Sequence, residues 1–475
     1  MIVSSVQAWH AEQARLAAAG AQKLAVEERN QKEEQRRLAE EAKTWAEKRR
    51  AETSAVLDFV QERILAAARP EKQDGGLGRE VKLIDAIRAS LPALESNFKD
   101  QPLIEAQLRN VIGLSFAYLG EFTTADAMFR RAVELYSTHL GPDHLETLRS
   151  RNNVALALCE FGRHAEALPT FEDVLARRRE KLGSGHPSTC SSMNCLAMCY
   201  TAMGRQKEAL RLLEEAVANM KGGVGPDNEA TLNYMNSLAN CYGHLGRHDE
   251  AIALYTTTLE KQRRILGVDH PATLTTQSNF AYEYAATGKH EEALRLQLES
   301  LRARESKMGP EHADTLGSMN SVALAFDNLG RHDEAQETYS KLIKRLDAKL
   351  QQHPELWELA VMQGGACCNL GSSLMAAGKT TDALPWFAKG QARLQSMLEA
   401  QPNSARARLF LRNIFWTRAE ADERLSLYAD ADADWNKASE LSAENARAGL
   451  RSERQRYLKE RPMPETAAPT KPNAK

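Results

Sequence analysis

The motif GRHAEA at residues 162–167 decides the fold, because near-copies recur along the chain: GRQKEA at 204–209, GRHDEA at 246–251, GKHEEA at 288–293 and GRHDEA at 330–335. Their leading glycines share a 42-residue spacing, and Gly120 extends the series one step towards the N-terminus. Gly378 and then Ser426 follow after two equal, longer steps. An alanine stands five residues after each of these eight positions. So regular a spacing predicts tandem structural repeats.

Each repeat is predicted to be a pair of antiparallel helices. In the repeat around Gly246, Tyr242 and Leu238 stand four and eight residues before the glycine, and the small Ala239 stands seven before it. These offsets place the three side chains on one helix face. The alanine after the glycine, followed four residues later by Tyr255, marks the inner face of a second helix. Glycine permits the positive φ that the chain reversal between the helices requires.

The composition favours helices and excludes several classes of function. The 475 residues are 43% hydrophobic but only 6% aromatic, which argues against a large β-protein. A net charge of −2 argues against a nucleic-acid or membrane-surface binder. We find no apolar run long enough to span a membrane. Seven cysteines without a cleavable signal predict reduced thiols in a cytoplasmic protein.

The glycine, small-residue and alanine spacing resembles the tetratricopeptide repeat. Its 42-residue period, with linkers such as LGVDHPATL at 266–274, is similar to the kinesin-light-chain subtype. The resemblance implies an all-α, right-handed superhelical solenoid of antiparallel helix pairs, with the first helices lining its concave surface. We expect six repeats of this period over 105–348 and two longer, divergent repeats over 349–447.

The flanks differ from the repeats. Residues 1–70 mix both charge signs densely and predict a long helical stalk that could pair as a coiled coil with a second copy. We expect a break and an N-terminal capping helix over 71–104. Residues 448–475 should hold the end of a terminal helix and a Pro-rich disordered tail.

The N-terminal flank carries a second resemblance. An Ala/Glu/Arg-rich helix followed by VLDFVQERILAAARPE at 56–71 is similar to the region after the kinase domain and membrane helix of certain bacterial Ser/Thr protein kinases. The kinase motifs themselves, the Gly-rich loop, HRD and DFG, are absent from the sequence. The alternative hypothesis is therefore the sensory or docking region of a Ser/Thr kinase whose catalytic domain is missing from this chain.

No motif predicts catalysis, a metal or a cofactor. Eight of the twelve histidines recur in two columns, in the linkers and just after the turn glycines, which indicates helix caps and turns. Cys190, Cys195 and Cys199 form C-x4-C-x3-C, with His186 as a conceivable fourth zinc ligand, but buried cysteines in helix packing explain them better. AAGKTT at 376–381 lacks the first glycine and the strand of a phosphate loop. We expect a protein that is not an enzyme.

The candidate site is a column of amides. Ten residues before the turn glycine stand Asn110, Asn152, Asn194, Asn236 and Asn320. Ser278 takes this position in the one remaining repeat of the regular series. Four residues further on, the same trough should be lined by Leu114, Leu156, Met198, Asn240, Tyr282 and Leu324.

Two hypotheses explain the asparagines. They could clamp the backbone of an extended peptide in the concave groove, as the family resemblance implies, or they could join neighbouring repeats. Arg109 and Arg151, one residue before the column, hint at an acidic ligand. We predict a non-enzymatic scaffold that binds a protein or peptide partner in this groove.

Overall fold

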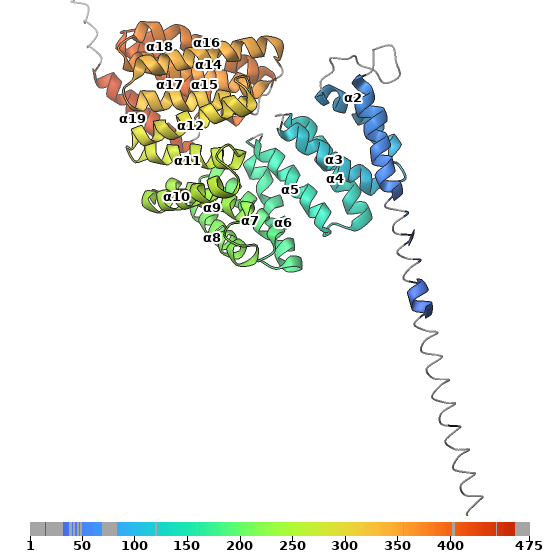
Figure 1. Ribbon diagram of the computed structural model, residues 1–475. Helices are drawn as coiled ribbons and strands as arrows, with labels where there is room; N and C mark the ends of the chain where they lie inside the picture. The colour runs from blue at the N-terminus through green and yellow to red at the C-terminus, as the bar shows by residue number, and fades with distance from the viewer. Residues whose placement is uncertain are drawn as a thin grey trace, which may run out of the picture. The chain divides into compact units, whose positions relative to one another are not determined.

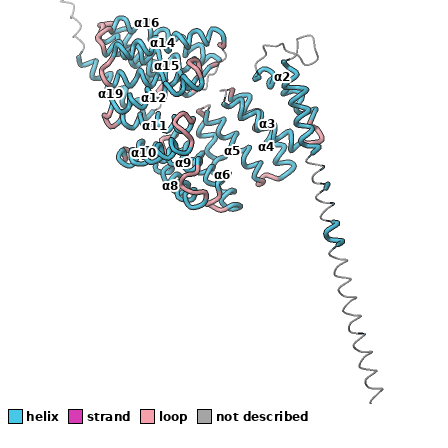
Figure 2. Tube along the Cα trace, in the orientation of Figure 1, coloured by secondary structure: helices cyan, strands magenta, loops and turns pink. Residues whose placement is uncertain are grey.

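The computed structural model describes residues 15, 32–37, 40, 43–44, 47, 50–68, 83–118, 121–160, 162–354, 356–400, 404–442 and 444–460. Within these residues the regular secondary structure is helical, without strands (Figures 1 and 2). The chain divides into two compact units, Met1–Ile112 and Gly113–Lys475, and each is described by itself. None of the described helices is both long and apolar enough to cross a membrane.

The first unit has a small aromatic core. A helix over residues 50–59 continues as a π-helical turn, η1 (Val60–Ile64), and a 3-10 turn, η2 (Leu65–Ala68), and packs against α2 (Leu83–Asn97). Phe59 and Phe98 meet edge to face, with ring centroids 5.5 Å apart. Most of the predicted stalk lies outside the described residues, so its self-association and a kinase partner stay predictions. The Pro-rich tail also lies outside them.

The second unit is a stack of helix pairs, which follows α3 (Pro102–Tyr118) along the chain (Figure 1). Its helices are α4 (Phe122–Leu140), α5 (Leu145–Glu160), α6 (His164–Leu182), α7 (Pro187–Ala202), α8 (Gln206–Gly223), α9 (Glu229–His244), α10 (His248–Ile265), α11 (Pro271–Ala286), α12 (His290–Met308), α13 (Ala313–Asn328), α14 (His332–Gln352), α15 (Trp357–Ala376), α16 (Thr380–Ala400), α17 (Ala405–Arg424), α18 (Tyr428–Glu440) and α19 (Glu444–Glu460). Each helix packs on the next, and first helices of successive pairs also touch, as α5 touches α7 and α15 touches α17. The predicted all-α solenoid of antiparallel helix pairs is confirmed.

The turns between paired helices depend on a left-handed residue. Gly162, Gly204 and Gly246 have φ of 72°, 76° and 74°, and the later turn glycines match them. Ser426, placed in this series by spacing alone, has φ 62° and is the one non-glycine residue with positive φ in the described part of the chain. A side chain in this conformation is strained, because Cβ crowds the backbone.

The helix crossings are close because small residues fill them. The alanine of each turn motif is buried, as are the aromatic residues four positions later, such as Phe171 and Tyr255. At Gly371 a Cβ atom would lie 2.4 Å from the Phe387 ring, so glycine is required there.

The linker histidines cap the first helices, as predicted. The imidazole Nδ1 of His186 accepts a hydrogen bond of 3.1 Å from the Ser188 backbone N–H. The other three linker histidines make the same bond, and Asn228, in the same column, does so through Oδ1. These bonds satisfy backbone donors that a helix start leaves open.

Candidate functional site

The first helices of the second unit share one face, and large side chains on it are exposed. Met198 is 54% exposed, Tyr282 48%, Leu114 40% and Leu324 37%. These four side chains stand at the same position of their repeats. Leu156 and Asn240 are half-buried on the same column. We call these six residues the trough.

Several asparagines of the predicted column join neighbouring first helices. Asn279 on α11 donates through Nδ2 to Oδ1 of Asn236 on α9, at 3.2 Å. Asn369 on α15 donates to Oδ1 of Asn320 on α13, also at 3.2 Å. These two bonds cross from one repeat to the next. In both pairs the donor stands one residue beyond the column in the following repeat, an offset that is visible in the sequence.

The remaining column residues differ from this pattern. Asn152 on α5 lies 3.6 Å from the Cys195 sulfur on α7, which also links two repeats. Asn194 reaches only the Met198 sulfur of its own helix, at 3.7 Å, and its Oδ1 has no hydrogen-bond partner among the described residues. Asn110 is buried in the first unit.

Two trough residues are also engaged. Tyr255 donates to Oδ1 of Asn240, and the hydroxyls of Tyr282 and Ser321 lie 2.7 Å apart. Some side chains of the amide column and the trough therefore bond other parts of the array, and others are exposed.

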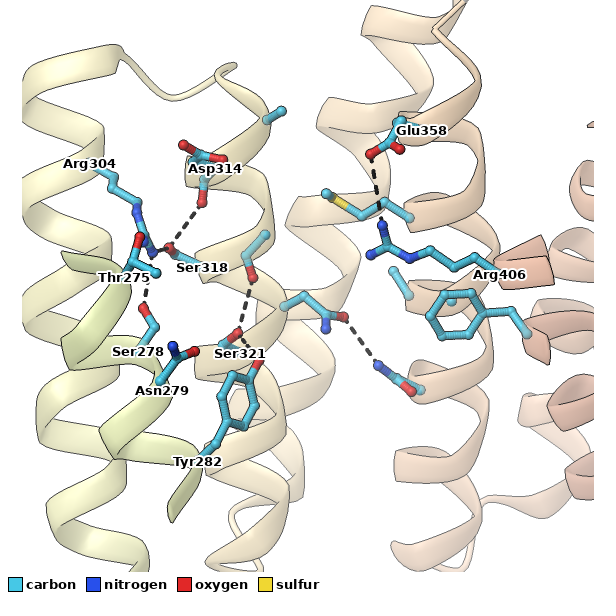
Figure 3. Close-up of a pocket in the computed structure, with 18 residues that line it drawn as sticks. Thr275, Ser278, Asn279, Tyr282, Arg304, Asp314, Ser318, Ser321, Glu358 and Arg406 are labelled. Carbon is cyan, nitrogen blue, oxygen red and sulfur yellow. Dashed lines mark hydrogen bonds and ion pairs between the residues drawn. The ribbon is translucent and has the colours of Figure 1, made fainter. Parts of the chain in front are cut away.

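A cavity of about 410 Å³ opens on the shared face towards the C-terminal end of the array (Figure 3). Residues of α11, α13, α15 and α17 line it, and Arg304 reaches in from α12. Its uncharged polar lining has three amides and five hydroxyl groups: Asn279, Asn320, Asn369, Thr275, Ser278, Tyr282, Ser318 and Ser321. Each amide has more donor and acceptor positions than its inter-repeat bond uses. The cavity wall can therefore still bond a peptide backbone.

Four charged residues line this cavity: Asp314, Glu358, Arg406 and, held by hydroxyl groups, Arg304. Nη1 of Arg304 donates to the hydroxyl oxygens of Ser278, at 3.2 Å, and Ser318, at 2.5 Å. Arg304 makes no ion pair within the described part of the chain. Burial lowers the pKa of its guanidinium, because the charged form has lost water contacts. The Asp314 carboxylate opposes this shift, because its longer-range electrostatic attraction raises the pKa. A half-buried cation held by neutral groups is a favourable place for an anion.

Arg406, on the opposite side of the cavity, is already paired. Its Nη1 lies 3.8 Å from Oε2 of Glu358 (Figure 3). Arg304 is therefore the cation of the cavity that a ligand carboxylate could reach without displacing an ion-pair partner.

Arg178 occupies the same repeat position as Arg304, three repeats earlier. It donates to the Ser192 hydroxyl at 2.7 Å and to the Ser188 carbonyl at 3.0 Å, and burial lowers its pKa too. Arg178 does not line the cavity. The two arginines thus share one structural role, and only Arg304 adds its charge to the cavity.

The arginines singled out from the sequence are paired within the chain. Arg109 bonds Glu105 at 2.7 Å, and Arg151 bonds Asp173 at 2.6 Å. Both arginines already pair with a carboxylate of the chain, so they do not support the predicted acidic ligand. Sequence reasoning missed Arg304 because it stands on a second helix. Its recurrence at Arg178, among neutral residues in the same column, was the available signal.

The C-x4-C-x3-C cysteines do not come together as a ligand set. Cys190 donates to the Ser184 carbonyl at 3.5 Å, and Cys195 faces Asn152. All seven cysteines are free.

Comparisons with known proteins give a matching family model and similar solved structures. The family model of the tetratricopeptide repeat matches residues 104–180, 151–222, 227–306 and 284–348. A variant of kinesin light chain TPR-like repeats from Podosopora anserina is 31% identical, covering 43% of this chain and 96% of that chain with a TM-score of 0.39. The apo quorum sensor NprR from B. thuringiensis is 16% identical, covering 82% of this chain and 99% of that chain with a TM-score of 0.50. The comparison with curated proteins gives no match.

Proposed function

The chain belongs to the tetratricopeptide repeat family, and from this premise we propose that it is a non-enzymatic scaffold that binds an extended peptide segment of a partner protein. The fold supports a protein-interaction role, and the shared face of the first helices is the surface proposed for it. One observation carries the proposal furthest: Arg304 sits in a cavity of this face without an ion-pair partner in the described residues.

The proposed binding mode combines three kinds of contact. Backbone groups of the peptide bond the free positions of the cavity amides, Asn279, Asn320 and Asn369. Apolar side chains of the peptide lie against Met198, Tyr282 and other exposed trough residues. An aspartate or glutamate of the peptide enters the cavity and pairs with Arg304.

The charge of Arg304 sets the expected selectivity. A hydrogen bond to a charged group contributes about 1.5–3 kcal/mol. Since about 1.4 kcal/mol is a factor of ten in affinity, replacing the acidic residue of the ligand by its amide should weaken binding about tenfold to a hundredfold.

The test is a selection of random decapeptides on the full chain, repeated with Arg304→Met and Arg178→Met. Arg178→Met is the matched control, because it removes bonds of the same kind from a residue outside the cavity. We expect one acidic position to be enriched on the natural chain and on Arg178→Met, and lost on Arg304→Met. Failure to enrich any peptide would overturn the scaffold proposal. Acidic enrichment that survives Arg304→Met would overturn the role of Arg304.

A further inference from the structure

The histidines that follow the turn glycines have recurring partners. Nδ1 of His248 lies 2.6 Å from a carboxylate oxygen of Glu283, which stands 35 residues later. Nδ1 of His332 lies 3.0 Å from a carboxylate oxygen of Asp327, which stands five residues earlier. The repeat therefore brings two positions, one before the turn and one on the next first helix, to the ring of the turn histidine.

In the repeat of His164 both of these positions are cysteines. Cys159 stands five residues before His164, and Cys199 stands 35 residues after it. The two sulfur atoms and an imidazole nitrogen all lie within 4.8 Å of one another. Nδ1 of His164 is buried and has no hydrogen-bond partner among the described residues.

The three side chains lie on three successive helices. Cys159 lies at the end of α5, His164 opens α6, and Cys199 lies on α7. The turn is fixed by a 2.8 Å hydrogen bond from the Gly162 N–H to the Cys159 carbonyl. The Cys199 thiol is tied to the same turn through the His164 carbonyl, at 3.5 Å. The ligand set thus comes from the end of α5, the start of α6 and the last turn of α7, in two adjacent repeats.

The chemistry of this set suits a soft cation. Two thiolates and one neutral imidazole are ligands that zinc prefers, and their two charges would balance Zn²⁺. Zinc binds the deprotonated thiolates, so binding would release the protons of both thiols.

We propose that Cys159, His164 and Cys199 form a zinc site whose fourth position is open to water or an external ligand. Ligand atoms of a tetrahedral zinc site lie about 3.3–3.8 Å apart, given Zn–S and Zn–N bonds of about 2.3 and 2.0 Å. The three ligand atoms of this chain, all within 4.8 Å of one another, lie close to that spacing. Zinc would join α5, α6 and α7, and so stiffen one junction of the array.

The repeats themselves provide controls. Cys241 stands where Cys199 stands, one repeat later, and its thiol donates to the Gln206 carbonyl at the same 3.5 Å. That repeat has Thr201 and Gln206 in place of the second thiol and the imidazole. Cys241→Ala therefore removes an equivalent buried thiol outside the proposed site.

The experiment titrates the full-length, tag-free, reduced chain with Co²⁺ and then displaces it with Zn²⁺. We expect one equivalent of Co²⁺ to give a thiolate-to-cobalt charge-transfer band that zinc removes. Loss of a second-shell partner alone costs about 10–100-fold in metal affinity, so Cys199→Ala and His164→Gln should each weaken binding at least that much. Gln is the residue of the neighbouring repeat at this position, which makes His164→Gln compatible with the fold.

The controls decide the outcome. Cys241→Ala should bind the metal as the natural chain does, and far-UV circular dichroism should show all variants equally helical. Absence of the charge-transfer band in the natural chain overturns the site. Unchanged Co²⁺ affinity in His164→Gln, or an equal loss of affinity in Cys241→Ala, also overturns the three-residue ligand set.

Discussion

Replacing Asn236 by alanine should weaken the junction between α9 and α11. Asn236 Oδ1 accepts the 3.2 Å hydrogen bond from Asn279, and both side chains are partly buried. A hydrogen bond of this kind contributes about 0.5–1.5 kcal/mol net, and leaving its donor unpaired adds to the cost. We therefore expect Asn236→Ala to lower the free energy of unfolding by about 1–2 kcal/mol.

Equilibrium urea unfolding of the full chain measures this change. Asn194→Ala is the matched control, because Asn194 bonds no neighbouring repeat and its loss should cost less than about 0.5 kcal/mol. Hydrogen exchange should place the loss of protection of Asn236→Ala in α9 and α11, because each repeat contacts only its neighbours.

A double-mutant cycle isolates the bond itself. Asn236→Ala combined with Asn279→Ala should give a coupling energy of about 0.5–1.5 kcal/mol. A coupling energy below about 0.3 kcal/mol, the scatter expected of independent sites, would refute a stabilising bond between these repeats.

Three further predictions concern single positions. Gly371→Ala should destabilise by about 1–3 kcal/mol in urea unfolding, because its Cβ would clash with the buried Phe387 ring. Ser426→Gly should raise the thermal midpoint and increase the free energy of unfolding by about 1 kcal/mol. Glycine removes the backbone strain of a residue with φ 62°. Burial raises the pKa of Asp422 to about 6, and the Asp434 carboxylate adds to the shift. The raised pKa means that ionised Asp422 destabilises the folded state. This destabilisation begins near pH 4, the pKa of the unfolded chain, and is fully developed above about pH 6. Asp422→Asn should therefore raise the thermal midpoint at about pH 7 but not below about pH 4.

Much of the fold could be predicted because the repeat fixes each residue's role. The turn position of Ser426 follows from repeating the step between Gly330 and Gly378, and its positive φ confirms it. The buried alanines follow from the same spacing. Local spacing also predicts which face of a helix a residue occupies.

The details of the site could not be predicted in this way. Spacing gives the direction of Asn236 but not its distance to Asn279, because that distance depends on how closely two first helices pack. The cysteine pair was missed for a similar reason. Cys159 and Cys199 lie almost a full repeat apart in the sequence and meet only because the turn of one repeat lies beside the first helix of the next.

Site-specific photo-crosslinking tests most directly whether a partner segment lies on the shared face of the first helices. A photoreactive amino acid replaces Tyr282, exposed on α11, or Glu337, exposed on the second helix α14. A selected acidic decapeptide is added to each full-length variant, and its attachment is quantified by mass spectrometry. The account predicts strong cross-linking from position 282 and little from position 337. Equal labelling at both positions, or labelling from 337 alone, would contradict it.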